Sequence, residues 1–248
     1  MPNSDIFKGD WLPNISVDCV IFGFQENHLK VLLLKFRHNE VWSLAGGFIG
    51  KQEDAEDAAK RVLWQRTGLE NIYLQQFHTF GDLKRNIGAI EKHQEINLAM
   101  GRSNDDLKWL SLRYISIGYY ALVDYLKVKV TLNEVSDESA WMDVDQIPAL
   151  FLDHNEIIKT GLVHLRSSIY TKLAAFNLLP ETFTMSELQK VYETILGKEL
   201  VRTNFQRKML SLDILERIEK KYSGGAHKAP YLYRLDRKKA EAFLSSAS

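Results

Sequence analysis

The first part of the chain alternates between apolar and polar positions in a way that is typical of β-strands. Residues 14–24 place an apolar side chain at nearly every second position, and residues 28–36 are rich in Val, Leu and Phe. A period of two puts alternate side chains on one face of a strand. Because only the short polar turn at residues 25–27 separates the two segments, we expect them to pair as a hairpin.

The pattern changes to a helical period after the glycines at 46, 47 and 50. Apolar side chains between residues 54 and 66 recur every three or four positions, which predicts a helix. Gly68 is a natural stop for that helix. Further along, residues 72–80 and 114–124 have the character of strands, and we expect residues 127–132 to pair with the second of these.

The pattern between residues 155 and 197 predicts two helices. Residues 155–178 carry apolar side chains at helical spacing up to Pro180, which cannot continue a helix. The next helix begins at Thr184, because Thr184 at the N-cap and Glu187 three residues later form a capping box. Phe183 and Leu188 occupy the positions of a hydrophobic staple, and we expect Gly197 to end the helix.

A third helix is expected from about Thr203, where Thr203 and Gln206 offer another capping box. This helix would bury Phe205, Met209 and Leu212. Two short helices joined by a Gly-containing turn are typical of a helix-turn-helix. Strands expected at 215–222 and 231–235, with the basic loop 223–230 between them, indicate a winged version. A small helical domain with solvated Lys and Arg is the alternative.

Composition narrows the class of protein. The 248 residues include 32 Lys or Arg and 32 Asp or Glu, but residues 180–248 hold 13 basic and 9 acidic side chains. This basic excess points weakly to nucleic acid. No apolar run approaches the length of a membrane span, and the N-terminus lacks the pattern of a signal peptide. The lone Cys19 excludes an intrachain disulfide, so we expect a cytoplasmic protein that does not contact membranes.

The most specific motif lies between residues 46 and 69, and it resembles a Nudix box. Six positions fall on the spacing of that box, namely Gly47, Glu53, Arg61, Leu63, Gly68 and Leu69. Three later positions that are Glu in the box hold other residues here, namely Val62, Gln65 and Arg66. The chain therefore keeps the skeleton of the box and loses most of its acidic cluster.

The lost carboxylates decide the expected chemistry. Nudix-type hydrolysis needs Mg²⁺ or Mn²⁺ to polarise phosphoryl oxygens, and such hard ions prefer carboxylate oxygens and water. The amide of Gln65 and the cation of Arg66 do not replace those ligands. We therefore predict no metal, no cofactor and no hydrolase activity. A hydrolase with a relocated base and a nucleotide-sensing adaptor that binds protein remain as rival hypotheses.

Together, the two halves resemble the Nudix-related transcriptional regulators over nearly the whole chain. In the second half, the resemblance rests on residues 183–188, 192–193, 195–197, 204–205, 207–208, 230 and 232–234. Residues 153–154 and 165–166 also resemble that family's connector. It implies an α+β fold in which a Nudix-like mixed β-sheet, sandwiched by helices, precedes a C-terminal winged helix-turn-helix domain. The expected divisions are a sensing domain at 1–153, a connecting helix at 154–179 and a DNA-binding domain at 180–248.

The family's pattern also implies details of structure and function. Residues 141–143 and 147–148 would correspond to the late strand and short helix of a Nudix fold. Val201 departs from the pattern, since the family often has Asp at the start of the second helix. The resemblance implies a homodimeric repressor that binds a double-stranded DNA operator and responds to a small effector. Loss of the metal chemistry favours a pentose such as arabinose, whereas an anion contact by Arg66 would favour ADP-ribose.

Candidate site residues follow from these positions. The Nudix cleft would be lined by Arg37, Trp42, Phe48, Lys60 and Tyr119. Contacts to DNA are expected from the second helix and the wing, at Arg202, Thr203, Asn204, Arg207, Lys208, His227, Lys228 and Arg234. The insertion at about 84–109, with a helix expected at 89–100, is either a surface excursion or a lid over the pocket or the dimer partner.

Overall fold

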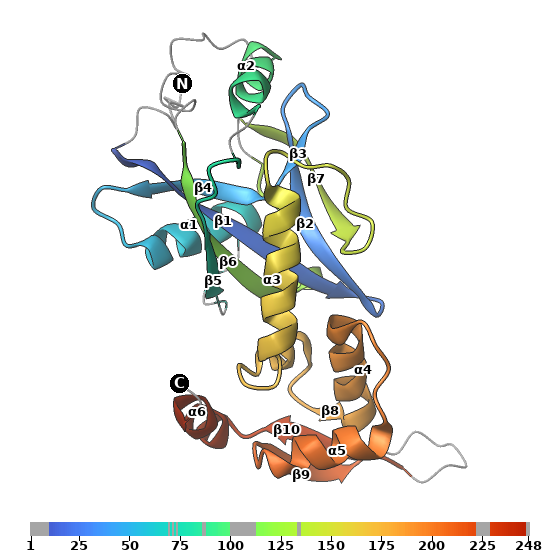
Figure 1. Ribbon diagram of the computed structural model, residues 1–248. Coiled ribbons are helices and arrows are strands. Elements are labelled where there is room, and N and C mark those ends of the chain that lie inside the picture. The colour runs from blue at the N-terminus through green and yellow to red at the C-terminus, as the bar shows by residue number, and fades with distance from the viewer. Residues whose placement is uncertain are drawn as a thin grey trace. The chain divides into compact units, whose positions relative to one another are not determined.

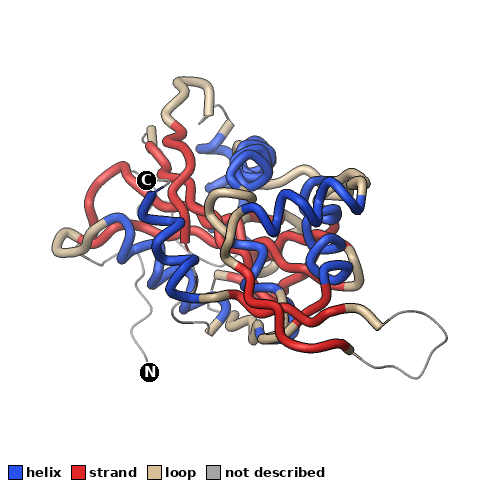
Figure 2. The backbone as a smooth tube through the Cα atoms, turned by 90° about the horizontal axis from the view of Figure 1, so that it is seen from below, coloured by secondary structure: helices blue, strands red, loops and turns tan. Residues whose placement is uncertain are grey.

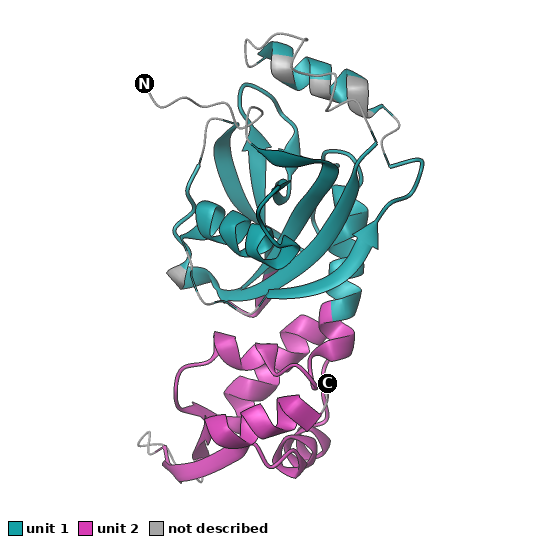
Figure 3. Cartoon of the chain, turned by 90° about the vertical axis from the view of Figure 1, so that its left-hand side faces the viewer, with its two compact units in different colours: residues 1–23, 30–164 teal, residues 24–29, 165–248 magenta. Residues whose placement is uncertain are grey.

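A computed structural model describes residues 10–68, 70, 72, 74–85, 88–99, 113–132, 135–221 and 229–246. The chain divides into two compact units (Figure 3). The first contains Met1–Gly23 and Lys30–His164, and the second contains Phe24–Leu29 and Leu165–Ser248. The division falls inside a helix, whereas the sequence pattern placed a separate connector at 154–179.

The first unit is built on a sheet that contains seven strands among the described residues. The order is β3-β2-β1-β6-β5, with β4 paired to β1 and β7 paired to β2 (Figure 1). The predicted hairpin corresponds to β1 and β2, and the long aromatic strand to β6. The strands span Trp11–Gln25, His28–Phe36, Trp42–Ser43, Ala45–Gly50, Leu74–Phe80, Ile115–Asp124 and Ser136–Asp143 for β1 to β7.

Helices cover both faces of this sheet (Figure 1). The odd-numbered residues Val17, Cys19 and Ile21 of β1 belong to one core cluster with buried residues of α1 (Ala55–Thr67). On the other face, Val20 of β1 approaches Gly161 of α3 (His154–Ser168). Alternate side chains of β1 therefore pack against helices on opposite faces of the sheet. The expected sheet sandwiched by helices is confirmed.

The helix of the box forms as predicted. Its buried residues are small or aliphatic, and Gly68 ends it with a left-handed φ of 70° while donating from its N–H to the carbonyl of Trp64 at 2.7 Å. The expectation that residues 127–132 pair with β6 is wrong. The N–H groups of Lys129 and Thr131 instead donate to the carbonyls of Thr67 and Arg66, at 3.2 and 3.1 Å. These terminal carbonyls have no partner inside the helix.

Two further expectations in the first unit have different outcomes. Residues 89–99 form α2 (Ala89–Ala99), so the helix in the insertion is confirmed. Residues 147–149 are irregular, so the short helix after β7 is wrong, although β7 itself is confirmed. Here the N–H of Leu150 donates to the side chain of Asn155 at 2.8 Å, and the same side chain donates to the carbonyl of Pro148. The amide side chain of Asn155 therefore supplies hydrogen-bond partners for two backbone groups of this irregular segment.

The expected single helix over 155–178 is also wrong. Helix α3 ends at Ser168, whose carbonyl accepts from the N–H groups of both Thr171 and Lys172. Leu173 then takes a left-handed φ of 53°, and a short 3-10 helix, η3, follows at Ala174–Leu178. The reversal buries Leu173, Ala174, Ala175 and Phe176. Burial of these apolar side chains overrides the helical period.

The second unit has the order of a winged helix. Helices α4 (Met185–Leu196) and α5 (Arg202–Ser211) are followed by β9 (Leu215–Lys220) and β10 (Tyr231–Leu235), which run side by side as a hairpin (Figure 2). The short strand β8 (Phe183–Thr184) pairs with β10. The helix α6 (Arg237–Ser246) follows the hairpin and was not predicted. The expected winged helix-turn-helix is confirmed.

The two predicted capping boxes have opposite outcomes. At α4, the backbone N–H of Thr184 donates to Glu187 at 2.6 Å and the N–H of Glu187 donates to Thr184 Oγ1 at 3.2 Å. At α5, the N-cap is Val201 without a side-chain cap, so the expected Thr203 box is wrong. The extended Val201 accepts the first helical hydrogen bond through its own carbonyl, from Phe205 N–H at 2.9 Å. Leu212 follows α5 and is only half-buried.

In the described part of the chain, no helix combines the length and the apolar character that crossing a bilayer requires.

Candidate functional site

The skeleton of the box is held together by Glu53 and Arg61. Both oxygens of Glu53 accept from the guanidinium of Arg61, at 2.8 and 2.9 Å, and one also accepts from the N–H of Gly50 at 3.0 Å. Arg61 donates further to the carbonyl of Phe48 at 2.8 Å. The hydrogen bonds from Arg61 hold the pKa of Glu53 below its ordinary value. Glu53 therefore fastens the loop before α1 to the helix.

The three altered positions do not fit a divalent cation. Val62 is buried beneath Gly47, where an added Cβ would lie 2.8 Å from a methyl carbon of Val62. Gln65 is exposed and offers a neutral amide. Among the described residues, no group of three His, Cys, Asp or Glu side chains is arranged to hold a metal ion. With Glu53 already engaged by Arg61, the donor set required by Mg²⁺ is missing.

Arg66 brings an unusual charge to the box. Its side chain is partly exposed as a whole, but its Nη1 atom is buried and has no hydrogen-bond partner. Burial lowers the pKa of Arg66, although the group stays protonated because arginine titrates far above neutrality. A buried donor without a partner costs about 1–3 kcal/mol, and more when it is charged.

Four of the five expected cleft residues have contacts that place them in separate parts of the first unit. Trp42 lies next to Lys35, whose ammonium is 6.0 Å from the ring centroid. Lys60 is exposed on α1 and pairs with Glu56 at 2.8 Å. Tyr119 is buried in the core cluster, and its hydroxyl lies 3.3 Å from Gln76 Oε1. Arg37 donates its backbone N–H to the carbonyl of Val135 at 2.8 Å.

Phe48, the remaining cleft residue, belongs to a group of half-buried aromatic rings. Its centroid lies 6.4 Å from that of Trp11 and 5.9 Å from that of Tyr114. The guanidinium of Arg61 lies 5.3 Å from the Trp11 ring. The structure therefore brings Phe48 beside the box, together with two aromatic residues that the sequence analysis missed. The signal was weak, because Trp11 and Tyr114 sit at strand starts with no motif around them.

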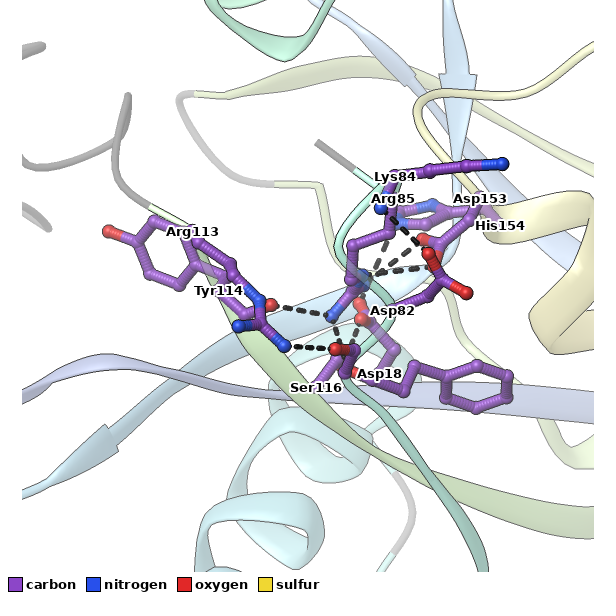
Figure 4. A network of polar contacts seen from close by, with 11 residues as sticks. Asp18, Asp82, Lys84, Arg85, Arg113, Tyr114, Ser116, Asp153 and His154 are labelled. Atoms are coloured by element: carbon purple, nitrogen blue, oxygen red, sulfur yellow. Dashed lines mark hydrogen bonds and ion pairs between the residues drawn. The ribbon is translucent and has the colours of Figure 1, made fainter. Parts of the chain in front are cut away.

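A buried polar network lies at the start of α3 (Figure 4). Ser116 donates its hydroxyl to Asp18, and His154 Nε2 lies 3.8 Å from the other oxygen of Asp18. His154 Nδ1 accepts from the N–H of Leu44 at 2.9 Å. Burial lowers the pKa of His154, although Asp18 opposes this effect. The network joins β1, β6, α3 and the segment that leads into the box.

Arg85 forms the second part of this network. It donates to both oxygens of Asp153, at 2.9 and 3.0 Å, and to the carbonyls of Phe80 and Tyr114, at 2.9 and 3.2 Å (Figure 4). Its side chain is almost fully buried. Arg85 lies in the insertion, so the beginning of the insertion is fastened to the core. No local pattern distinguishes Arg85 from the other basic residues of that segment.

Helix α5 exposes most of the expected DNA contacts. Arg202, Thr203, Asn204 and Arg207 are all exposed, and Arg207 donates to Asn204 Oδ1 at 3.1 Å. The ammonium of Lys208 lies over the ring of Tyr170. Together these residues present amide, hydroxyl and guanidinium groups on one helix, as groups that read base edges and phosphates do.

The expected wing contacts are placed less clearly. His227 and Lys228 lie outside the described residues. Arg234 is described and exposed, but its guanidinium lies 2.8 Å from Glu216 and 3.9 Å from Glu181. Its charge is therefore shared with two carboxylates of the same unit, a competition that the sequence pattern did not indicate.

Comparisons with known proteins agree with this arrangement. The family profile described as NUDIX domain matches residues 12–161, and the profile described as NrtR DNA-binding winged helix domain matches residues 175–235. The chain is 27% identical, over 90% of its length and 82% of the relative's, to a protein of Acinetobacter baylyi named ADPR responsive transcriptional repressor NtrR.

Solved structures support the same assignment. NrtR of Shewanella oneidensis in complex with a 27mer DNA superposes with a TM-score of 0.68 at 26% identity, over 92% of this chain and 95% of that one. A MutT/nudix family protein of Enterococcus faecalis, at 19% identity, shares the fold with a TM-score of 0.64 over 90% of this chain and 86% of that one. The chain therefore belongs to the Nudix-related transcriptional regulators, in which a Nudix domain precedes an NrtR-type winged helix domain.

Proposed function

We propose that this protein is a transcriptional repressor that binds operator DNA through α5 and responds to ADP-ribose. The proposal of DNA binding rests on the exposed face of α5, where Asn204 and Arg207 lie side by side. Amide and guanidinium side chains are the groups that make bidentate contacts to adenine and guanine in the major groove. The relative from Acinetobacter baylyi is named as such a repressor, and the Shewanella oneidensis neighbour was solved with DNA.

The operator is read by a homodimer in this proposal. Two recognition helices of a dimer bind half-sites about 34 Å apart, or a multiple of that distance, on one face of the duplex. The effector shifts the dimer toward a state with lower DNA affinity, and it does so only by its differential affinity for the two states. Sedimentation of the protein with and without a half-site and a full-site duplex tests the stoichiometry. A single monomer on the full site would refute the dimer.

ADP-ribose is favoured over a pentose such as arabinose because of Arg66. A neutral sugar leaves the buried Nη1 of Arg66 without a counter-charge, whereas a diphosphate supplies anionic acceptor oxygens. The aromatic group of Trp11, Phe48 and Tyr114 offers rings on which a purine base can stack. The name of the Acinetobacter baylyi relative points to the same effector.

Calorimetric titration with ADP-ribose and, separately, with L-arabinose tests the effector. We expect binding of ADP-ribose and a loss of about 10- to 100-fold in affinity for Arg66→Gln, since a hydrogen bond to a charged group contributes about 1.5–3 kcal/mol. Lys159→Gln is the control, because Lys159 is exposed on α3 and pairs with Glu156. Binding of arabinose without binding of ADP-ribose would reverse the assignment.

Binding without turnover completes the proposal. The box retains Glu53 but engages it with Arg61, and it places Val62 and Arg66 where metal-binding carboxylates are required for hydrolysis. Incubation with ADP-ribose and Mg²⁺ should yield no AMP above the level of a protein-free control. Steady release of AMP that Glu53→Gln abolishes would establish the rival hydrolase instead.

A further inference from the structure

The start of α3 is attached to the box by two separate contacts. The first runs through His154, the first residue of the helix, whose Nδ1 accepts from the N–H of Leu44 at 2.9 Å. An accepting Nδ1 carries no proton, so the proton of the neutral imidazole is on Nε2, which faces Asp18. His154 and Asp18 are both buried, at 7% and 6% exposure. The contact is thus shielded from water and has a single proton arrangement.

Two residues after Leu44 come the glycines Gly46 and Gly47. The backbone at Gly46 rests against the Asp18 carboxylate, leaving no room for a Cβ, and Gly47 rests against Val62 of α1. The four residues from Leu44 to Gly47 therefore contact the His154 network at one end and α1 at the other. A displacement of this segment changes the acceptor geometry at His154.

The second contact runs from the aromatic group to Asp153. The ring of Tyr114 packs against Phe48, and the carbonyl of Tyr114 accepts from Arg85 at 3.2 Å. Arg85 in turn holds both oxygens of Asp153, which precedes α3 directly. A ligand that stacks on Phe48 and Tyr114 therefore acts on the same helix start that His154 anchors.

Helix α3 begins in the first compact unit and ends in the second, since the division falls between His164 and Leu165. The helix is continuous across that division. Because hydrogen bonds within a helix make it a stiff element, a shift at its first turn is carried along its axis. The chain connection to the DNA-binding unit thus starts at the Asp153–His154 pair.

We propose that Asp153 and His154, held by Arg85 and Leu44, are positioning residues that couple effector binding to DNA binding without touching either ligand. The proposal rests on the proposed function. The ligated box moves Leu44 and Tyr114, the two anchors of α3 readjust, and the DNA-binding state changes. Coupling of this kind is measured as the ratio of the dissociation constants for DNA with and without effector. The dissociation constants for the effector, measured with and without DNA, must give the same ratio.

Substitution of His154 provides the direct test. His154→Leu removes the acceptor for Leu44, whereas His154→Asn keeps an acceptor oxygen near the Nδ1 position. Fluorescence anisotropy on operator DNA, with and without saturating ADP-ribose, gives the coupling ratio for each protein. We expect His154→Leu to bring the ratio close to one while DNA affinity alone and ADP-ribose affinity alone change by less than about threefold, and His154→Asn to retain most of the ratio.

A second variant avoids a buried charge without a partner. In Arg85→Met combined with Asp153→Leu, apolar side chains replace the whole ion pair, an exchange that is often neutral or stabilising. We expect this protein to fold, as thermal melting would show, and to lose most of the coupling ratio. Glu156→Gln is the control on the same helix, because Glu156 is exposed and pairs with Lys159. This control should keep the wild-type ratio.

The outcomes separate the two proposals. If wild-type protein shows no change of DNA affinity with ADP-ribose, the proposed effector response fails and the coupling role fails with it. If the wild-type protein responds and the double variant responds equally, the proposed function stands and the role of the pair is refuted. If Glu156→Gln loses as much of the coupling ratio as the double variant does, the role of the pair is also refuted, because a general weakening of α3 would then explain both results.

Discussion

The ammonium of Lys208 on α5 lies 3.3 Å from the centre of the Tyr170 ring, in the segment that follows α3. The Tyr170 ring in turn packs against Tyr192 of α4, which packs against Phe205 of α5, with centroids 5.0 and 5.3 Å apart. The turn after α3 is therefore tied to the recognition helix through aromatic contacts within the second unit. Lys208, which the sequence marked as a DNA contact, serves as part of this tie.

The contact between Lys208 and Tyr170 should be measurable as stability. A cation over an aromatic face contributes about 0.5–1 kcal/mol at a partly exposed site. Tyr170→Leu should therefore lower the unfolding free energy more than Tyr170→Phe, which keeps the ring. Urea denaturation of both variants, each with and without Lys208→Met, gives the pairwise energy. If the loss of unfolding free energy in the Tyr170→Leu, Lys208→Met double variant equals the sum of the losses in the two single variants, the contact contributes nothing.

Two arginines of the second unit should differ in their effect on operator binding. Arg207 is exposed beside Asn204, and its loss should weaken binding by about 1–3 kcal/mol, or roughly 10- to 100-fold, if it reads a base. Arg234→Ala should have a smaller effect, because Glu216 and Glu181 already share its charge. Anisotropy titrations of both variants on operator and on unrelated DNA check this ranking. The reverse ranking would assign the main contact to the wing.

The pH dependence of stability should reveal the contribution of the ion pair between Glu53 and Arg61. The hydrogen bonds from Arg61 lower the folded-state pKa of Glu53 below its ordinary value of 4.5. The contribution of the pair is therefore complete above pH 4.5 and is lost as the pH falls through the folded-state pKa. Glu53→Gln should flatten this part of the stability curve, measured by thermal melting between pH 3 and 6 in steps of about half a unit. An unchanged slope would contradict the assignment.

Local signals in the sequence predicted much of this fold. The capping box at Thr184 and the glycine stop at Gly68 form as expected, because each depends on residues within one helical turn. The end of α3 at Ser168 was missed because burial of Leu173 and Phe176 is decided by the rest of the second unit. The helical period of the sequence continues through this break and contains no sign of it.

The candidate site shows the same limit more strongly. The altered box positions were readable because the box has a fixed spacing, and Phe48 was predicted as a cleft residue for the same reason. The pairing of Arg85 with Asp153 spans 68 residues, and that of Asp18 with Ser116 spans 98. Such contacts depend on how β1, β6 and α3 are packed together. A single sequence holds no signal for such contacts.

Protonation of His154 should weaken the fold in a pH window separate from that of Glu53. Burial lowers the folded-state pKa of His154 below its ordinary value of 6.5, even though Asp18 and Asp153 oppose the shift and Arg85 adds to it. The unfolded chain therefore takes up the proton first as the pH falls, so stability declines from about pH 6.5 toward the folded-state pKa and then levels off. Below that value the native imidazole also carries a proton.

A His154→Asn variant supplies the control for this window, because Asn does not titrate and keeps an acceptor for Leu44 N–H. The difference in unfolding free energy between the wild-type protein and this variant should change as the pH falls below about 6.5 and stay constant from pH 7 to 8. Two-dimensional NMR of the imidazole carbons, followed over the same range, would report the folded-state pKa directly. A native imidazole that titrates at or above 6.5 would show that Asp18 outweighs burial and would reverse the sign of the prediction.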